Sequence, residues 1–348
     1  MLSELPPKII ADRLVELSPV QSLLYSAFAS SPASEGVRRA IATAASEAEE
    51  EASMIDAGAA GGAATVLNAL QYLRKVCNHP LLVLLPDHPL RQEAERLAAS
   101  SGTSLSSLSV APKLTALKQI LDECGIGTAD FGVDAPDAES GASHGGGEAV
   151  VVGTATLASH RALVFAQSSS MLDRVEEDLL KAHLPSVSYL KLDGRVPAAR
   201  RGAIVESFNS DPSIDLMLLT TSVGGLGLNL TSADTVVFLD HDWNPMKDLQ
   251  AMDRAHRLGQ KRSVSVFRLI TRGTLEEKIM SLQRFKVSLI PSMLSTRREQ
   301  HKSLGQRTLV PASVVVFDEW GDPDALALTR LVARAADPMR RSMSRVPW

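Results

Sequence analysis

Between residues 159 and 290, short apolar runs alternate with segments in which apolar residues recur at helical spacing. Short apolar runs indicate strands that are buried on both faces, whereas spacings of three and four residues indicate helices. Their regular alternation predicts an α/β fold in which helices cover both faces of a parallel sheet. The predicted strands are 162–166, 187–192, 216–219, 235–239 and 263–270, and the predicted helices are 168–180, 197–208, a helix after Pro245, and 274–289.

The first 126 residues have a more interrupted pattern. Serine before proline marks a helix start, because serine caps the helix and proline suits its first position. Three helices are predicted here: one from Pro19 after Ser18, one from Val66 that ends at Asn78-His79-Pro80, and one from Pro112 that ends at Gly125. Stretches rich in small and polar residues predict insertions, flexible helix or linker at 30–64, 98–109 and 127–158.

Charge and cysteine content narrow the possible classes of protein. The 348 residues have a net charge of −4, so a uniformly basic surface is excluded, although residues 261–307 are rich in lysine and arginine. Two cysteines, Cys77 and Cys124, make no disulfide framework and favour a reducing compartment. The first residues have no apolar signal core, and the apolar runs are too short to cross a bilayer.

A glycine-rich turn and two arginines suggest chemistry on an anion. Gly224, Gly225 and Gly227 follow a predicted strand, and Arg254 and Arg257 lie three residues apart on the predicted helix after Pro245. Two guanidiniums on one helix face, beside a glycine turn at the carboxyl end of a strand, predict a polyphosphate site. In the alternative interpretation, both arginines are solvated cations that favour a helix end.

The motifs of this region resemble the second RecA-like lobe of superfamily-two helicases, in particular the Swi/Snf-type DNA translocases. Five motifs occur in the same order and at the same spacing as in that family. They are ALVFAQ at 162–167, LDG at 192–194, LTTSVGGLGLNL at 219–230, DWNP at 242–245 and QAMDRAHRLGQ at 250–260.

Segments outside that lobe extend the resemblance. Residues 70–84 resemble the segment that connects the two lobes of such motors, and residues 5–28 resemble the end of the first lobe. Three further segments, 124–127, 209–215 and 269–280, resemble the subgroup of ATPases that strip TATA-binding protein from promoter DNA. This resemblance implies TATA-binding protein or another DNA-bound protein as a partner, and nuclear residence.

The resemblance implies ATP and Mg²⁺ as cofactors, held between two lobes. Arg254 and Arg257 match arginine fingers, which meet the γ-phosphate when the lobes close. Gly225 and Gly227 would let the backbone approach the nucleotide, and Gln250 lies in the same motif.

Positions that match the DNA-facing motifs imply double-stranded DNA as the track. They are Gln167, Gly194, Arg201, Thr220, Thr221 and Trp243. Such residues grip phosphates without reading bases. Capping and solvation explain the polar residues equally well, and Trp243 has a partly buried core indole as its alternative. Arg195 departs from the family, which often has a small hydroxyl residue there, so it would add a phosphate contact or displace the usual one.

No phosphate loop of the form G-x-x-x-x-G-K-S/T occurs in the 348 residues. Asp318-Glu319 follows the arginine motif rather than preceding it and is a spurious match to a magnesium pair. Cys77 and His79 are too few for a four-ligand metal site, so no metal site is predicted. We therefore expect half an ATP site, with the first lobe in cis and the chain inactive by itself.

Two further interpretations stay open at the sequence level. The chain is either a motor half or a non-catalytic module that binds DNA or a partner, and a motor acting on RNA is a third possibility. The predicted domains are 1–29 as the end of the first lobe, 30–64 as an insertion, 65–126 as a helical connector, 127–158 as a linker, 159–290 as the carboxy-terminal lobe and 291–348 as a divergent tail.

Overall fold

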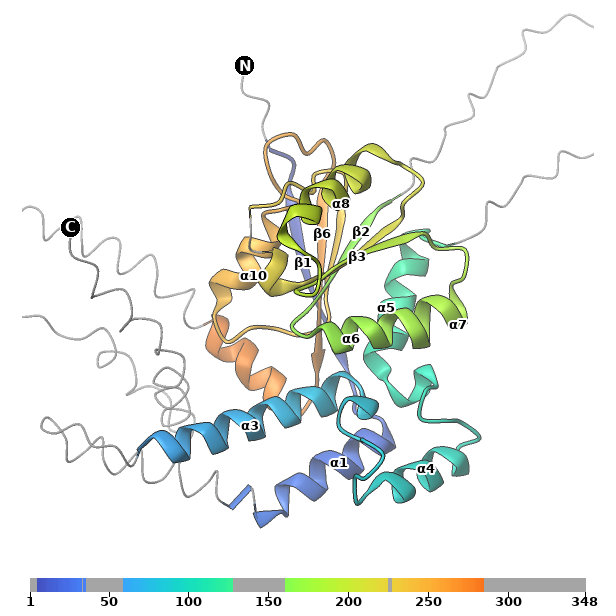
Figure 1. Cartoon of the computed structure of the whole chain (residues 1–348), viewed down its shortest axis with the longest axis vertical. Helices are drawn as coiled ribbons and strands as arrows, with labels where there is room; N and C mark the ends of the chain where they lie inside the picture. The colour runs from blue at the N-terminus through green and yellow to red at the C-terminus, as the bar shows by residue number, and fades with distance from the viewer. Residues whose placement is uncertain (1–4, 33, 36–58, 128–159, 225–226, 285–348) are drawn as a thin grey trace, which may run out of the picture. The chain divides into compact units, whose positions relative to one another are not determined.

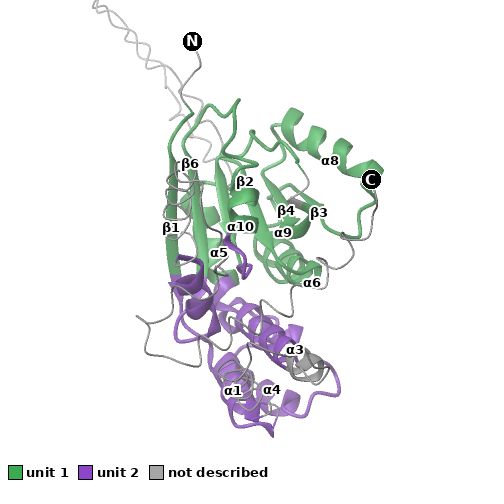
Figure 2. Cartoon of the chain, turned by 90° about the vertical axis from the view of Figure 1, so that its left-hand side faces the viewer, with its two compact units in different colours: residues 1–13, 114–239, 246–269 green, residues 14–113, 240–245, 270–348 purple. Residues whose placement is uncertain are grey.

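The computed structural model describes residues 5–32, 34–35, 59–127, 160–224 and 227–284, with only the backbone path for 59–65 and 224. The chain forms two compact units, shown in green and purple in Figure 2. Unit 1 comprises Met1–Arg13, Leu114–Leu239 and Met246–Leu269, and unit 2 comprises Leu14–Lys113, Asp240–Pro245 and Ile270–Trp348. Residues 33 and 36–58 of the predicted insertion 30–64, residues 128–158 of the predicted linker 127–158 and the whole predicted tail 291–348 lie outside the described residues.

Six strands form one sheet in the order β1-β6-β5-β2-β4-β3 (Figure 1). The pairs that join β2, β3, β4, β5 and β6 are all parallel. Val264 donates its backbone N–H to Pro7 and Arg272 donates to Val15, so β1 runs parallel to β6 as well. The strands are β1 Lys8–Val15, β2 Ala162–Ala166, β3 Tyr189–Leu192, β4 Leu216–Thr220, β5 Thr235–Phe238 and β6 Val264–Thr271.

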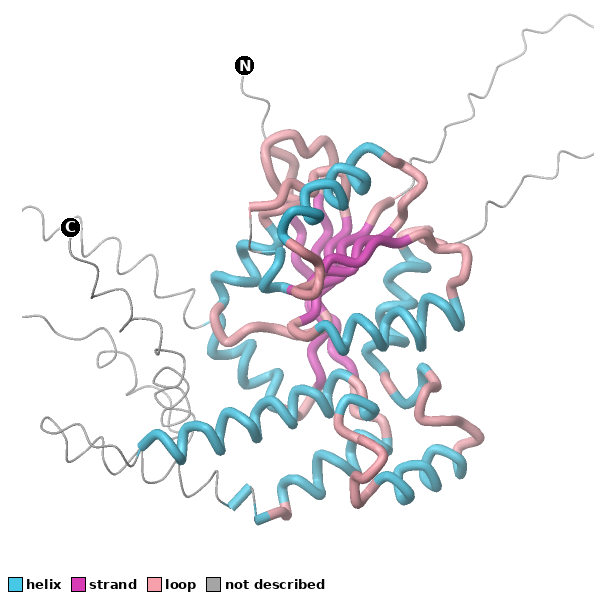
Figure 3. The backbone as a smooth tube through the Cα atoms, viewed as in Figure 1, coloured by secondary structure: helices cyan, strands magenta, loops and turns pink. Residues whose placement is uncertain are grey.

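Helices cover both faces of this sheet (Figure 3). One face packs against α8 and α10, and the other faces α5 and the α6–α7 segment. These elements are α5 Pro112–Glu123, α6 Ser169–Arg174, the π-helix η3 Val175–Leu180, α7 Lys181–His183, α8 Ala198–Ser210, α9 Thr221–Gly224 and α10 Pro245–Met252. The predicted parallel α/β fold is therefore confirmed, with a π-helical turn inside the predicted helix 168–180.

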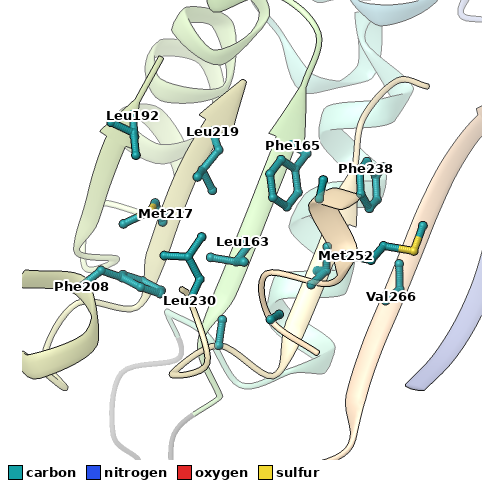
Figure 4. Packing of buried hydrophobic residues seen from close by; sticks show 14 of the residues in the cluster. Leu163, Phe165, Leu192, Phe208, Met217, Leu219, Leu230, Phe238, Met252 and Val266 are labelled. Atoms are coloured by element: carbon teal, nitrogen blue, oxygen red, sulfur yellow. The ribbon is translucent and has the colours of Figure 1, made fainter. Parts of the chain in front are cut away.

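The core explains why the central strands are apolar throughout. Every residue of β2, β4 and β5 is buried, because both faces of the sheet are covered. In Figure 4, Phe165 and Phe238 stack across neighbouring strands, with ring centroids 5.1 Å apart. Phe208 of α8 and Met252 of α10 close the same face, so these helices are fixed on the sheet by burial of apolar surface.

Unit 2 is mostly helical. Its elements include α1 Pro19–Ala29, α3 Ala59–Asn78, the 3₁₀ turns η1 Pro80–Leu82 and η2 Leu108–Val110, α4 Arg91–Ser100, and a helix over 275–284. Ser18 and Gln21 form a capping box at α1, which confirms the predicted start. α4 was not predicted, because its Ala- and Glu-rich sequence has few apolar residues. No helix of the described part of the chain is both long and apolar enough to span a membrane.

Candidate functional site

The turn that carries the two arginines, residues 253–260, differs from the sequence prediction. α10 ends at Met252, so Arg254 and Arg257 do not lie on a helix. The backbone continues through tighter turns, in which Arg254 and Ala255 each donate to the carbonyl three residues earlier. The Arg254 carbonyl accepts a hydrogen bond from Leu230 N–H at 3.0 Å, and a φ of +104° at Gly259 redirects the chain. We call residues 253–260 the arginine turn.

Side chains fix this arginine turn from within. The Gln260 amide donates to the carbonyls of Thr231, Ala233 and Ala255, and its oxygen accepts from the backbone N–H groups of Lys261 and Arg262. Gln260 is 8% exposed, so these hydrogen bonds are largely shielded from water. The arginine turn is thus held against the segment that follows the glycine loop.

The arginine turn lies near the amino ends of the strands, not at a carboxyl end as the sequence suggested. His256 contacts the Pro6 carbonyl just before β1, and Gln260 contacts Ala233 just before β5. In Figure 4, Leu230 lies toward the end of the sheet opposite Leu192 and Leu219. α10 starts beyond the carboxyl end of β5 and runs back along the sheet, so the two arginines that follow it lie near the amino ends of the strands.

Exposure and charge at the arginine turn suit an anion. Arg257 is exposed and Arg254 is half-buried, while the neighbouring Asp253 carboxylate pairs with Lys8 at 3.0 Å. Gly227 has a φ of +76° and no atom within 4 Å of a Cβ added there, so its backbone is accessible. Gln250 is exposed on α10, and Gly225 lies outside the described residues.

The predicted DNA-facing residues of unit 1 follow the carboxyl ends of β2, β3 and β4. Ala166 pairs with Thr220 in the sheet, so Gln167 and Thr221 leave neighbouring strands at the same level. Thr220 and Thr221 are each 3% exposed, and Thr221 Oγ1 donates to the Ala166 carbonyl. Their side chains are committed to the fold, so a contact with DNA would use the backbone or a small movement.

Gly194 and Arg201 are the accessible members of this carboxyl edge. Gly194 is exposed, with open space where a Cβ would be. Arg201 donates from Nε to the Val196 carbonyl at 3.0 Å, which orients a half-buried guanidinium. The structure thus brings Gln167, Gly194, Thr220 and Thr221 to one edge of the sheet, with Arg201 on the adjoining helix α8.

Arg195 is engaged by two acids. Its guanidinium donates to Asp193 Oδ2 and to both carboxylate oxygens of Asp173. Hydrogen bonds from Arg195 lower the pKa of Asp173, and these carboxylates raise the pKa of Arg195. At Asp193 burial opposes ionisation, but hydrogen bonds from Arg195 prevail and lower the pKa. Asp173, Glu176, Lys191, Asp193 and Arg195 form what we call the surface ionic cluster.

Trp243 belongs to unit 2 and is half-buried. Its segment, Asp240–Pro245, is held by side chains of that unit. Asn78 Nδ2 donates to Asp240 Oδ2 at 2.8 Å, Arg74 donates to the His241 carbonyl at 2.9 Å, and Gln283 donates to the Asp242 carbonyl. Trp243 is thus half-buried on an anchored segment, which fits both sequence interpretations.

Sequence reasoning missed the residues that hold this segment. Lys113 Nζ donates to Asn78 Oδ1 at 2.9 Å and forms an ion pair with Glu276. Lys113 begins an apolar helix face, and a buried lysine there gives no distinctive pattern. Cys77 and His79 have structural roles here. Cys77 is buried, which raises the pKa of its thiol to about 12, and the His79 side chain caps the amino end of η1. We call Arg74, Asn78, Lys113, Asp240 and Glu276 the buried polar chain.

Comparison with known proteins adds the family. The family model "Helicase conserved C-terminal domain" matches residues 149–259. The chain is 52% identical to human "TATA-binding protein-associated factor 172" over 311 residues, which is 89% of this chain and 16% of that protein. It is 44% identical to "TATA-binding protein-associated factor MOT1" of Saccharomyces cerevisiae, over 89% of this chain and 15% of that protein.

Residues 149–259 thus match a helicase conserved C-terminal domain, and the chain is similar over 89% of its length to TATA-binding protein-associated factors. The range matched by the domain model contains every predicted site residue, from Gln167 to Arg257. The buried Lys113 and α3 lie outside it.

A solved structure supports the fold of this chain. The Sulfolobus solfataricus SWI2/SNF2 ATPase core in complex with double-stranded DNA superposes with a TM-score of 0.51 at 24% identity. The match covers 85% of this chain and 48% of that core. At that identity the likeness establishes the fold, which is the RecA-like arrangement expected for a carboxy-terminal helicase lobe.

Proposed function

We propose that this chain is the carboxy-terminal half of an ATP-dependent translocase on double-stranded DNA, which remodels or removes DNA-bound proteins. TATA-binding protein is the proposed target, because relatives named for association with it share about half of the aligned residues. The observation that carries the proposal is the pinned arginine turn, in which an exposed and a half-buried guanidinium are held on a RecA-like lobe. Nuclear residence is part of the same proposal.

Arg254 and Arg257 are the groups that this chain would offer to the phosphates of ATP. A rigid cation contributes more to phosphoryl transfer than a mobile one, because its position needs no reorganisation as charge develops. The hydrogen bond from Leu230 N–H to the Arg254 carbonyl and the amide of Gln260 supply that rigidity. The accessible backbone at Gly227 and the exposed Gln250 complete the proposed nucleotide surface.

The 348 residues contain no phosphate-loop sequence, so a first lobe in cis is proposed to provide it together with the ligands of Mg²⁺. When bound, Mg²⁺ and ATP supply the phosphoryl chemistry. This chain would contribute positive charge to that shared site. We expect the 348-residue chain by itself to show no ATP hydrolysis above background.

The decisive experiment replaces each arginine in the protein that carries both lobes. Arg257→Ala and Arg254→Ala should each lower the DNA-stimulated rate of ATP hydrolysis by about 10³–10⁵-fold, the range typical of arginine fingers. Arg200→Ala, an exposed arginine on α8, is the matched control and should retain the parental rate. Parental turnover in both finger variants at saturating DNA would refute the proposal.

Substrate choice and reaction type have separate tests. Double-stranded DNA should stimulate hydrolysis more strongly than duplex RNA of the same length. Translocation without strand separation is expected, so displacement of a strand from a duplex by the two-lobe protein counts against the proposal.

The absence of a phosphate-loop sequence favours a second candidate, a non-catalytic module that binds DNA or a partner. Two results together would favour this candidate: the 348-residue chain binds DNA in a salt-dependent way, and ATP does not change the DNA affinity of the two-lobe protein. Nucleotide-dependent affinity in the two-lobe protein would exclude it.

A further inference from the structure

The segment that carries Trp243, Asp240–Pro245, is anchored by side chains of unit 2. Side chains contact it from two helices: Arg74 and Asn78 from α3, and Gln283 from the helix over 275–284. Asp240 and His241 are each 2% exposed, and the hydrogen bond from Asn78 to Asp240 is buried, while those from Arg74 and Gln283 are partly buried. The segment is therefore held by side chains from two helices as well as by its covalent links to β5 and α10.

Asn78 is the central link of the buried polar chain. Its oxygen accepts from the Lys113 ammonium and its amide nitrogen donates to the Asp240 carboxylate, at 2.9 and 2.8 Å. An asparagine amide has one acceptor end and one donor end, so only this orientation satisfies a cation on one side and an anion on the other. A flipped amide would face donor with donor, and the arrangement is therefore unique.

The far end of the buried polar chain is also fixed. Lys113 pairs with Glu276, and the second oxygen of Glu276 accepts from the Thr271 N–H at 2.9 Å. Arg74 lies 3.7 Å from Asp240 and balances its charge. Two cations and two anions are thus linked through one neutral amide; Asn78, Lys113, Asp240 and Glu276 are buried, and the Arg74 side chain is 14% exposed. In a low-dielectric interior, polar links of this kind specify one geometry.

We propose that Asn78 is a positioning residue that sets the placement of Trp243. Arg74 and Gln283 support the same segment through their hydrogen bonds to the carbonyls of His241 and Asp242. This inference rests on the proposed function for one point, the contact of Trp243 with double-stranded DNA. Asn78 is the last residue of α3, two residues before η1 begins at Pro80, and its side chain contacts the Trp243 segment through Asp240. It would act on DNA affinity through Trp243 and would make no contact with DNA itself.

The experiment uses the 348-residue chain with Trp320→Phe and Trp348→Phe, which leaves Trp243 as the remaining tryptophan. Acrylamide quenching of Trp243 fluorescence then reports its placement, and anisotropy of a labelled double-stranded DNA oligomer reports affinity. Asn78→Ala should increase quenching and weaken DNA binding by about tenfold, equivalent to about 1.4 kcal/mol. In the two-lobe protein, the DNA concentration for half-maximal hydrolysis should rise while the saturated rate changes little.

Asn68→Ala is the matched control, because Asn68 is an exposed asparagine on the same helix. It should leave quenching and DNA affinity at parental values. If Asn78→Ala fails to fold by circular dichroism, Asp240→Asn replaces it, since an amide keeps the shape and the acceptor but removes the charge that Arg74 balances. The inference is overturned if the folded variant leaves Trp243 quenching unchanged.

The two claims can fail separately. Increased quenching without loss of DNA affinity, together with full affinity in Trp243→Ala, supports the positioning role and overturns the DNA contact assumed in the proposed function. Unchanged quenching with weakened DNA binding overturns the positioning role and leaves the proposed function in place.

Discussion

The surface ionic cluster of unit 1 and the buried polar chain of unit 2 are built from the same residue types but differ in exposure, with Asp193 as the buried member of the surface cluster. Arg195 in the surface cluster is 58% exposed, and its partner Asp173 is 34% exposed. Lys113 and Glu276 in the buried chain are 1% and 3% exposed. Exposed ion pairs contribute little because water and salt screen them, whereas a buried charge without its partner is costly. The surface cluster can therefore be altered with little loss, and the buried chain cannot.

Breaking the buried pair should have the largest effect. Lys113→Met should lower the free energy of unfolding by about 3–5 kcal/mol, because the Glu276 carboxylate is left buried without a counter-charge. Urea unfolding followed by far-ultraviolet circular dichroism measures the change. The control is Arg272→Met, which removes an exposed pair with Glu16 and should change stability by less than about 0.5 kcal/mol. Equal losses in the two variants would abolish the contrast drawn above.

Removing both charges sharpens the same comparison. Lys113→Met combined with Glu276→Gln should recover more than half of the loss, because no ion remains buried and the amide can still accept from the Thr271 N–H. The same urea titration measures it. A double variant as unstable as Lys113→Met would mean that packing of the lysine, not its charge, is decisive.

Acid should affect the surface cluster through Glu176. Hydrogen bonds from Lys181 and then Lys191 lower the pKa of Glu176 to about 2. A depressed folded-state pKa contributes stability above the unfolded value of about 4.3, and this contribution is lost as the pH falls toward about 2. Glu176→Gln should therefore be less stable than the parent protein at neutral pH and equally stable near pH 2. The loss at neutral pH should be much smaller than that in Lys113→Met. A stability difference that grows on acidification would contradict this assignment.

Arg195→Ala should have the smallest effect. The Arg195 side chain is 58% exposed, and the buried Asp193 carboxylate keeps its hydrogen bond from the backbone N–H of residue 195. We therefore expect a loss of stability of about 1 kcal/mol or less and, because the guanidinium already binds two carboxylates, no change in the salt dependence of DNA binding. Arg201→Ala is the comparison and should reduce the slope of log affinity against log salt by about one, as the loss of a phosphate contact does. A similar decrease of the slope in Arg195→Ala would show that Arg195 breaks its ion pairs with Asp173 and Asp193 and binds a DNA phosphate.

Most of the fold could be predicted from local patterns; α4 and the carboxyl end of α10 are the exceptions. The strands 162–166, 216–219 and 235–239 were recognisable because buried parallel strands are apolar at every position. The helix predicted through Arg257 was wrong because successive tight turns keep Met252 and Ala255 buried at nearly helical spacing. What ends the helix is a hydrogen bond from Leu230 to the Arg254 carbonyl, a contact between segments more than twenty residues apart.

The candidate sites divide in the same way. The motifs named Arg254, Arg257, Gly194 and Trp243, and their roles stay predictions. The structure added that Thr220 and Thr221 are buried and that the arginine turn lies near the amino ends of the strands. Asn78 and Lys113 could not be found beforehand, because a single polar residue beside an apolar helix pattern does not reveal which distant charge it meets.

The sequence by itself determined the order of the strands and helices between residues 159 and 290, the family that the chain resembles and the residues that carry the motifs, because each depends on neighbours in the chain. Tertiary structure alone decided where the two arginines lie, which threonines remain accessible and which charges meet in the interior. Those features depend on hydrogen bonds and ion pairs between remote segments, such as Asn78 with Asp240, whose geometry exists only after the chain has folded.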